Sequence, residues 1–385
     1  MNFHKRSVLV SALALCLGMG SSTVMAQTVD IKLGFAAPLT GPQSHYGEDM
    51  RNGIQLALAE ANAKKIKVGG KVANFVLVIR DDQADPRIAV QVAQQLVDAD
   101  IRGVLGHFNS GTSIPASRIY NEAGLPQIST ATAPAYTKQG YNTTFRMLTS
   151  DTQQGGAVGR FMVKKLNVKK VAIIDDRTAY GQGLADQVEK AVKESGGQVV
   201  RREYTTDKAT DFASILTNVR TAGADAIFYA GADAQSGPLK RQMQQLGITA
   251  PLLSGEMSRT DTFLRLAGPA AEGTYASLAG LPIDTMPGGK TFKADYKARF
   301  NMEPGIYSPY SYDGTWNMVA AIEKAGSADP AKYLPVLAQQ QRKGLTSESI
   351  AYDAAGDLKE VAVTIYRVKG GKWEPAETAV GQAGK

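Results

Sequence analysis

The sequence is poor in the residues that most often carry chemistry. It has one cysteine, three histidines and two tryptophans in 385 residues. Cys16 lies in the N-terminal segment, and only His45 and His107 lie beyond it, so a zinc site would need carboxylates as its main ligands. There is no G-x-S-x-G elbow, no Walker A loop and no recognisable triad context for either histidine. The sequence therefore gives no support for nucleophilic, metal or phosphate-transfer chemistry, and no cofactor is expected.

The sequence also lacks an apolar run long enough for a comfortable membrane span, which needs about 20 residues. The apolar run at 8–17 is short and contains a serine. It follows the basic pair Lys5 and Arg6 and precedes Val24-Met25-Ala26, a pattern typical of a secretory signal peptide with its small-x-small cleavage site. We expect residues 1–26 to be removed and the product to enter the periplasm. The alternative is an uncleaved membrane anchor.

Charge gives little reason to expect a nucleic acid partner. Loss of the leader lowers the formal net charge from +7 to +5, and the remaining lysines are scattered along the chain. No arginine-rich tract is interleaved with aromatic residues, as a nucleic-acid-binding surface would require. A mildly basic, solvated surface is the simpler interpretation.

Short apolar segments alternate with amphipathic ones along most of the chain. Residues 31–37 and 75–79 are predicted to be strands, and a helix is predicted after Asp85-Pro86, where Asp serves as N-cap and Pro as the first helical residue. Such repeated strand–helix units imply parallel sheets covered by helices on both faces. The pattern restarts after Ser150. The sequence therefore predicts an α/β fold with two sheets in two lobes.

The C-terminal third follows a different pattern. Helices are predicted at 289–300, 311–325 and 330–341, followed by a strand at 360–368 and the turn Lys369-Gly370-Gly371-Lys372. Another helix, predicted at 236–246, ends the second run of strand–helix units.

One segment approaches a dinucleotide-binding fingerprint. Gly181-Gln182-Gly183-Leu184-Ala185-Asp186 follows a predicted strand and opens a helix, but its sixth position is Asp rather than Gly or Ala. An acidic side chain there is wrong in size and in charge for close packing beside a pyrophosphate. We interpret the segment as an ordinary helix start.

Two polar turns stand at predicted strand ends, where open α/β sheets bind ligands. Ser110 and the free N–H groups of the helix that follows it form an anion site suited to a carboxylate, although on spacing alone simple N-capping by Ser110 is the favoured interpretation. In the second turn, Thr132 can donate a hydrogen bond, and the carbonyl of Thr130 can accept one from an ammonium.

These motifs resemble the periplasmic leucine/isoleucine/valine-binding proteins of ABC importers over essentially the whole chain. The resembling segments occur in order at matching intervals, and they are Thr40-Gly41-Pro42 with Tyr46-Gly47, Asp81-Asp82 with Asp85-Pro86, Gly106-His107 with Pro115-Ala116-Ser117, Ala131-Thr132-Ala133-Pro134, Tyr180-Gly181-Gln182-Gly183-Leu184-Ala185, and Asp353 with Gly356-Asp357-Leu358. The resemblance implies a type I periplasmic-binding fold, with two doubly wound parallel-sheet lobes joined by three crossovers. The lobes expected are 27–148 with 279–350, and 149–278 with 351–385.

The resemblance also implies site residues. Ser110 and Thr132 look like a clamp for a carboxylate, with Thr130 and Ala131 offering backbone contacts. Tyr180 resembles the tyrosine that closes over the ligand from the second lobe, and Glu256 the acidic residue that holds its ammonium. A zwitterion needs donors at one end and a carboxylate at the other, and charge-assisted contacts are stronger in a closed cleft than in water. Tyr46 and Tyr307 are then candidate walls around the ligand side chain, with core packing as the alternative for Tyr307.

The chain departs from the family pattern in two places. The first-lobe disulfide of the family is missing, with Asn109 at one cysteine position and Ala84 where the other is expected. Where some members place a tyrosine near the ligand, this chain has Ala232 followed by Asp233. Asp233 could bind the ligand, or it could cap a helix at Ser236. The side-chain preference of the pocket is therefore left open by the sequence.

Three classes of function remain for comparison. The leading hypothesis is a monomeric binding protein that captures a free amino acid, branched-chain or similar, and delivers it to an ABC importer permease without covalent chemistry. Its alternative has the same fold but binds an aromatic acid, an amide or another amino acid, for uptake or as a ligand sensor. A secreted α/β enzyme is the third class, and the sequence shows no constellation that supports it.

Overall fold

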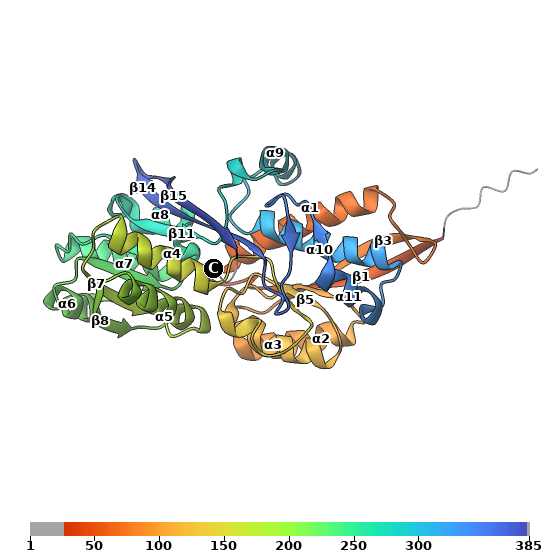
Figure 1. The fold of residues 1–385 in the computed structure, drawn as a ribbon, viewed down its shortest axis with the longest axis horizontal. Helices are drawn as coiled ribbons and strands as arrows, with labels where there is room; N and C mark the ends of the chain where they lie inside the picture. Colours follow the sequence, from red (N-terminus) through yellow and green to blue (C-terminus); the bar gives the residue numbers. More distant parts are fainter. Residues whose placement is uncertain (1–26, 383–385) are drawn as a thin grey trace, which may run out of the picture.

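The structure is a computed structural model that describes residues 27–382. The predicted leader and its cleavage site lie outside the described residues. Two large sheets organise the chain, and Figure 1 shows them side by side, each with its own helices. We call them, with the helices packed on them, the first and the second lobe.

The first sheet has six strands in the order β2-β3-β1-β4-β5-β6. All neighbouring strands run parallel except the short β2, which pairs antiparallel with β3. The strands are β1 (Thr28–Ala37), β2 (Lys67–Val68), β3 (Lys71–Asp81), β4 (Val104–Gly106), β5 (Gln127–Ser129) and β6 (Thr144–Arg146). Strands buried on both faces explain the nearly continuous apolar runs of the sequence.

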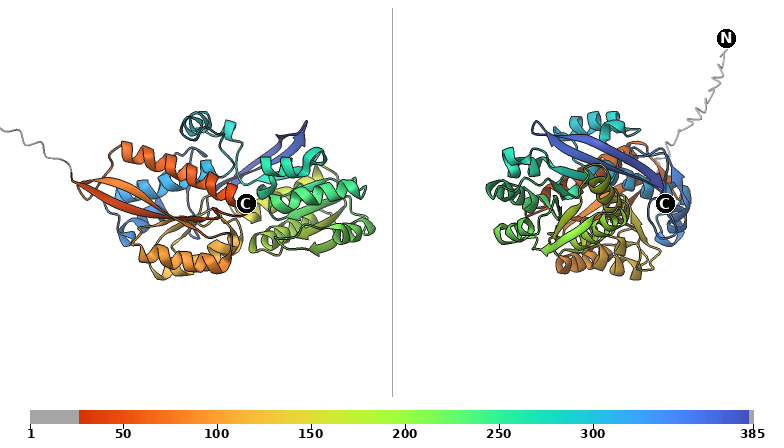
Figure 2. Two further views of the ribbon diagram at one scale, coloured as in Figure 1. Left: turned by 180° about the vertical axis from the view of Figure 1, so that it is seen from behind. Right: turned by 60° about the vertical axis from the view of Figure 1, so that its left-hand side comes forward.

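Helices cover both faces of the first sheet, as the sequence predicted. Phe35 of β1 packs in the same cluster as Ile54 of α1 (Ser44–Ala63), while its neighbour Ala36 packs with Leu96 of α2 (Pro86–Asp98) and with α3 (Ser110–Glu122). Successive residues of a strand face opposite sides. Figures 1 and 2 show α1 on one side of the sheet and α2 and α3 on the other. The start of α2 is as expected, because the Asp85 carboxylate accepts the N–H of Arg87.

The second sheet has seven strands in the order β15-β14-β11-β10-β9-β7-β8. The strands are β7 (Lys170–Asp175), β8 (Gln198–Tyr204), β9 (Ala226–Ala230), β10 (Leu252–Ser254), β11 (Tyr275–Leu278), β14 (Glu360–Lys369) and β15 (Lys372–Gln382). The last two form the predicted hairpin, and β14 runs antiparallel to both of its neighbours, β11 and β15. Gly370 and Gly371 both have positive φ, which a two-residue hairpin turn of the I′ kind requires.

The helices packed on the second sheet are α4 (Asp151–Lys164), α5 (Ala179–Glu194), α6 (Ala213–Thr221), α7 (Asp233–Gln245) and α8 (Asp261–Ala267). Helix α7 starts three residues before the predicted position. Its N-cap is Ala232, so Asp233 is the first helical residue, and the expectation that Asp233 caps a helix at Ser236 is wrong.

The chain passes between the two lobes three times, which confirms the expected fold class. It leaves the first sheet after β6, returns after β11 and crosses again before β14. Between the last two crossings lie α9 (Gly289–Phe300), α10 (Ser308–Ala325), α11 (Pro330–Gln339), β12 (Gln341–Arg342) and β13 (Ile350–Ala351). Helix α10 packs against α1 of the first lobe.

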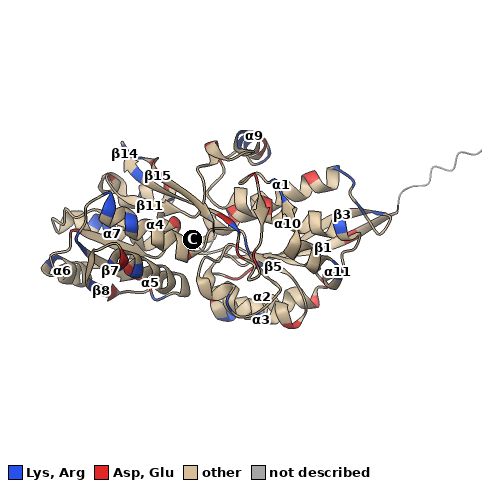
Figure 3. Ribbon diagram, in the orientation of Figure 1, with Lys and Arg blue, Asp and Glu red and all other residues tan. Residues whose placement is uncertain are grey.

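Charged residues are spread over the elements of both lobes with acidic and basic side chains interspersed, as Figure 3 shows. Within residues 27–382, no helix has the length and apolar character needed to cross a membrane.

Candidate functional site

The donor side of the site is built at the ends of β4 and β5. These strands are parallel neighbours in the first sheet, with Leu105 opposite Ile128. Because their carboxyl ends meet at one edge, the turns that carry Ser110 and Thr132 are brought together. The Ser110 hydroxyl accepts the backbone N–H of Ala133 at 3.2 Å, which ties the two turns directly.

Ser110 is the first residue of α3 rather than its N-cap. The N-cap is Asn109, and no side chain caps this helix end. The alternative that Ser110 serves as a simple N-cap is therefore wrong. The first N–H groups of a helix have no acceptor within the helix, and the Ser110 hydroxyl keeps its hydrogen available for a further bond while it accepts from Ala133. Together these groups can receive a carboxylate.

Thr130 and Ala131 lie in the same turn, but they are bonded within the first lobe. The Thr130 hydroxyl donates to the carbonyl of Phe108 at 3.0 Å. The Ala131 N–H donates to the Ser129 hydroxyl at 2.9 Å, and its carbonyl accepts from the Arg146 guanidinium. The backbone groups of Ala131, which sequence comparison offered as ligand contacts, are thus already used in holding the turn.

Arg146 is a structural residue that the sequence analysis missed. Its side chain is fully buried at the end of β6 and donates to Ala131, Ala133, Thr137 and the carboxylate of Asp357, the last at 2.7 Å. A buried guanidinium is tolerable only when its donors are paired. Arg146 therefore fixes the donor turn to the segment that leads into the third crossover.

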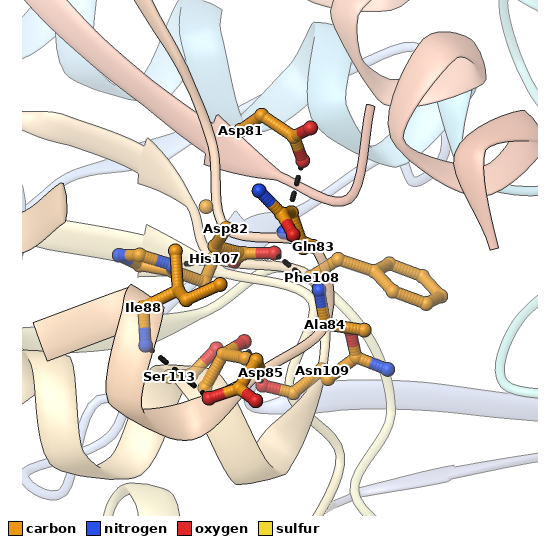
Figure 4. A network of polar contacts seen from close by, with 12 residues as sticks. Asp81, Asp82, Gln83, Ala84, Asp85, Ile88, His107, Phe108, Asn109 and Ser113 are labelled. Atoms are coloured by element: carbon orange, nitrogen blue, oxygen red, sulfur yellow. Dashed lines mark hydrogen bonds and ion pairs between the residues drawn. The ribbon is translucent and has the colours of Figure 1, made fainter. Parts of the chain in front are cut away.

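A buried polar contact joins the two loops that carry Ala84 and Asn109, between which the resemblance implied no disulfide in this chain. His107 Nδ1 lies 2.6 Å from Asp82 Oδ2, and both side chains are fully buried. The contact joins the loop that carries Ala84 to the loop that carries Asn109, as Figure 4 shows. Asn109 donates in turn to the Gln43 side chain at 2.7 Å. A polar network thus joins these loops in the absence of a covalent link.

The acceptor side of the site belongs to the second lobe. Glu256 begins a short 3₁₀ turn, Glu256–Ser258, directly after β10, and its side chain is buried. One of its oxygens accepts from the Tyr180 hydroxyl at 2.8 Å and from the Gln154 amide at 2.7 Å. Burial raises the pKa of the Glu256 carboxyl. The two predicted residues Tyr180 and Glu256 therefore contact each other directly.

Asp151 is a second buried carboxyl that the sequence analysis did not single out. It begins α4 at the first crossover, its N–H donates to the Thr132 carbonyl at 2.9 Å, and Gln154 bridges it to Glu256. Its Oδ2 atom has no hydrogen-bond partner among the described residues. Burial, together with the negative charge of Glu256, raises the pKa of Asp151 to about 8. In the sequence, Asp151 stands only as an acidic residue at the start of a predicted helix. Acidic residues are common at that position, so it did not indicate a binding site.

These contacts form one continuous set from the first lobe to the second. Two carboxyls that are buried side by side resist being charged together unless a cation joins them. The site therefore presents hydroxyl and N–H donors on the first lobe, and carboxyl groups suited to a cation on the second.

Three aromatic side chains pack beside this set. The ring of Tyr46 stacks on Phe108 with centroids 5.0 Å apart, and Tyr307 meets both rings edge-on. The Tyr46 hydroxyl donates across the lobes to the Met257 carbonyl. The Tyr307 hydroxyl is buried without a partner among the described residues. Tyr307 thus combines core packing of its ring with an unpaired hydroxyl, and Tyr46 joins the two lobes.

Asp233 makes a further direct contact between the lobes. Its Oδ2 atom lies 2.9 Å from His45 Nε2 of α1 and accepts from the Thr260 hydroxyl at 2.6 Å. His45, Tyr46, Thr260 and Tyr307 also line a cavity of about 310 Å³ that is open at the junction of the lobes. The lobes are therefore in contact around a space that both of them line.

Two lobes with sheets of this kind, three crossovers and a polar site between them define a two-lobed ligand-binding fold. The sequence matches the model of the family described as "Periplasmic binding protein" over residues 30–372. The chain belongs to this family.

Relatives and solved structures agree with that assignment. The chain is 35% identical over 329 residues to "Leu/Ile/Val-binding protein homolog 2" of Brucella abortus, covering 85% of this chain and 87% of that protein. Its structure is similar to a leucine-binding protein from Thermotoga maritima, with a TM-score of 0.84, 27% identity and coverage of 90% and 98%. It is also similar to the branched-chain amino acid transporter substrate-binding protein of Streptococcus pneumoniae solved with isoleucine, with a TM-score of 0.82, 27% identity and coverage of 92% and 100%.

Proposed function

We propose that this protein captures a free amino acid between its two lobes and delivers it to the permease of an ABC-type importer. The observation that carries the proposal is the pairing of Ser110 and Thr132 with Asp151 and Glu256 through one set of hydrogen bonds. A ligand carboxylate fits the donors and its ammonium fits the acids. The names of the relatives, which bind leucine, isoleucine or valine, support the same class of ligand.

The same proposal covers location and assembly. We infer export to the periplasm with removal of residues 1–26 after Ala26, and action as a monomer on the permease. The proposed lobes are 27–148 with 279–350, and 149–278 with 351–385. The proposed activity is binding and release without covalent turnover, in keeping with the family of binding proteins that the sequence matches.

Ligand screening tests the proposal. The mature protein, from Gln27 onward, is screened by thermal shift against the L-amino acids, aromatic carboxylic acids and short amides. A rise in melting temperature with at least one amino acid, and recovery of that amino acid unchanged after prolonged incubation, is the expected result. A response to acids that lack an amino group, with none to amino acids, would contradict it.

A further inference from the structure

Asp233 lies next to the ammonium site without belonging to it. Strands β9 and β10 are parallel neighbours, with Tyr229 opposite Ser254. Asp233 comes three residues after the end of β9, and Glu256 comes two residues after the end of β10. Both carboxyls therefore stand at the same edge of the second sheet, facing the first lobe.

The two oxygens of Asp233 differ in their surroundings. Oδ2 is fully engaged with His45 and Thr260, whereas Oδ1 is buried and has no hydrogen-bond partner among the described residues. The Asp233 side chain has no exposed surface, while that of His45 is one-third exposed. A buried acceptor left without a donor carries a free-energy cost, so an unpaired carboxylate oxygen in a binding region indicates where a ligand donor fits.

Tyr46 and Tyr307 place this oxygen beside the ligand site. The Tyr46 hydroxyl donates to Met257, the residue after Glu256, and lies 3.4 Å from the backbone nitrogen of Asp233. The hydroxyl of Tyr307, whose ring meets that of Tyr46 edge-on, is buried without a partner among the described residues. Tyr46 therefore contacts both the backbone next to Glu256 and the backbone of Asp233.

The residue before Asp233 leaves room for such a contact. Ala232 is buried and small, so no bulky side chain of that residue stands between Asp233 and the ligand site. An aliphatic ligand side chain in this part of the site would leave Oδ1 unpaired. A side chain with a hydroxyl or amide donor would satisfy it.

We propose that the preferred ligand is an amino acid whose side chain carries a hydrogen-bond donor, accepted by Asp233 Oδ1. This rests on the proposed function, in which Asp151 and Glu256 hold the α-ammonium. The class includes threonine and asparagine, and it excludes the purely aliphatic valine and leucine as preferred ligands. Since a hydrogen bond to a charged group contributes more than a neutral one, the preference should be about tenfold or more.

Pairs of ligands matched in shape test the inference by calorimetry. Threonine is compared with valine, and asparagine with leucine, on the wild-type protein and on Asp233→Ala and Asp233→Asn. We expect threonine and asparagine to bind at least about tenfold more tightly than their partners, and the difference to shrink to about twofold or less in Asp233→Ala. His45→Ala is the matched control, because it removes the bond to Oδ2 only and should weaken both members of a pair by the same factor.

The outcomes separate the inference from the function on which it rests. If no amino acid binds, the proposed function is wrong. If valine or leucine binds as tightly as its polar partner, the amino-acid function stands and the assignment of the side-chain class is overturned. A polar preference that persists in both Asp233 variants would overturn the role of Asp233. The wild-type comparison decides the ligand class even if a variant fails to fold.

Discussion

The two lobes meet the ligand site with opposite chemistry and with different internal support. On the first lobe, the proposed donors Ser110 and Thr132 are neutral; the fully buried Arg146 fixes the turn that carries Thr132, and the Ser110 hydroxyl accepts from Ala133 of that turn. On the second lobe, Asp151 and Glu256 are buried acids with no basic side chain within hydrogen-bonding distance among the described residues. The donor turns of the first lobe are held in place without a ligand, whereas the two acids of the second lobe lack a cationic partner among the described residues. The difference makes binding and lobe closure parts of one event.

The largest expected effect comes from removing the support of the donor side. Arg146→Met should lower the free energy of unfolding by about 3 kcal/mol, because it leaves Asp357 and the turn carbonyls without their buried partner. Chemical denaturation measures the change. Arg160→Met, on an exposed residue of α4, is the matched control and should change stability by less than about 0.5 kcal/mol. Equal losses in the two variants would contradict the role given to Arg146.

The acceptor side is tested by neutralising one acid. Glu256→Gln should weaken amino-acid binding by more than about 2 kcal/mol, roughly thirtyfold, because the buried ammonium loses its charged partner. Calorimetry at constant pH gives the affinity, and Glu194→Gln, which changes an exposed glutamate of α5, should leave it unchanged. An unchanged affinity in Glu256→Gln would move the ammonium site to Asp151 or Asp233.

The donor hydroxyl should contribute somewhat less. Ser110→Ala is expected to weaken binding by about 1.5 kcal/mol, because the ligand carboxylate loses one charge-assisted hydrogen bond. Ser117→Ala removes a hydroxyl from the same helix, where it donates to the Ile114 carbonyl, and should leave affinity unchanged. If both variants bind alike, Ser110 holds the turn and does not contact the ligand.

The last expected effect is a pH dependence of closure without ligand. Since burial raises the pKa of Asp151 to about 8, the closed form holds a proton that an open, solvated carboxyl near its ordinary pKa releases. The ligand-free closed form is then favoured below this range and loses stability as pH rises toward 8, by about 1 kcal/mol per unit. Small-angle scattering should show a smaller radius of gyration at pH 6 than at pH 8.5. Asp151→Asn should remove this difference, and its persistence would contradict the assignment to Asp151.

The fold could be predicted from the sequence because the caps and turns agreed with the alternation of strands and helices. The restart after Ser150, the cap at Asp85 and the glycines of the last hairpin each predicted what the structure shows. The site could be predicted only in part. Arg146 and Asp151 become interpretable only once β6 and the first crossover are placed in space, since their partners are distant in the sequence or in another turn. Asp233 could be singled out from the sequence. The difference between its bonded Oδ2 and its unpaired Oδ1 could not, because His45, which binds Oδ2, is 188 residues away.

The central claim is that the site binds an amino acid through donors on one lobe and acids on the other. Its most direct test is calorimetry of the wild-type protein with the amino acid that gives the largest thermal shift, and with the same molecule lacking only the α-amino group. We predict clear binding of the amino acid, and a loss of at least about a hundredfold for the deaminated acid, because it would leave Asp151 and Glu256 buried without a cation. Equal or tighter binding of the deaminated acid would contradict the claim.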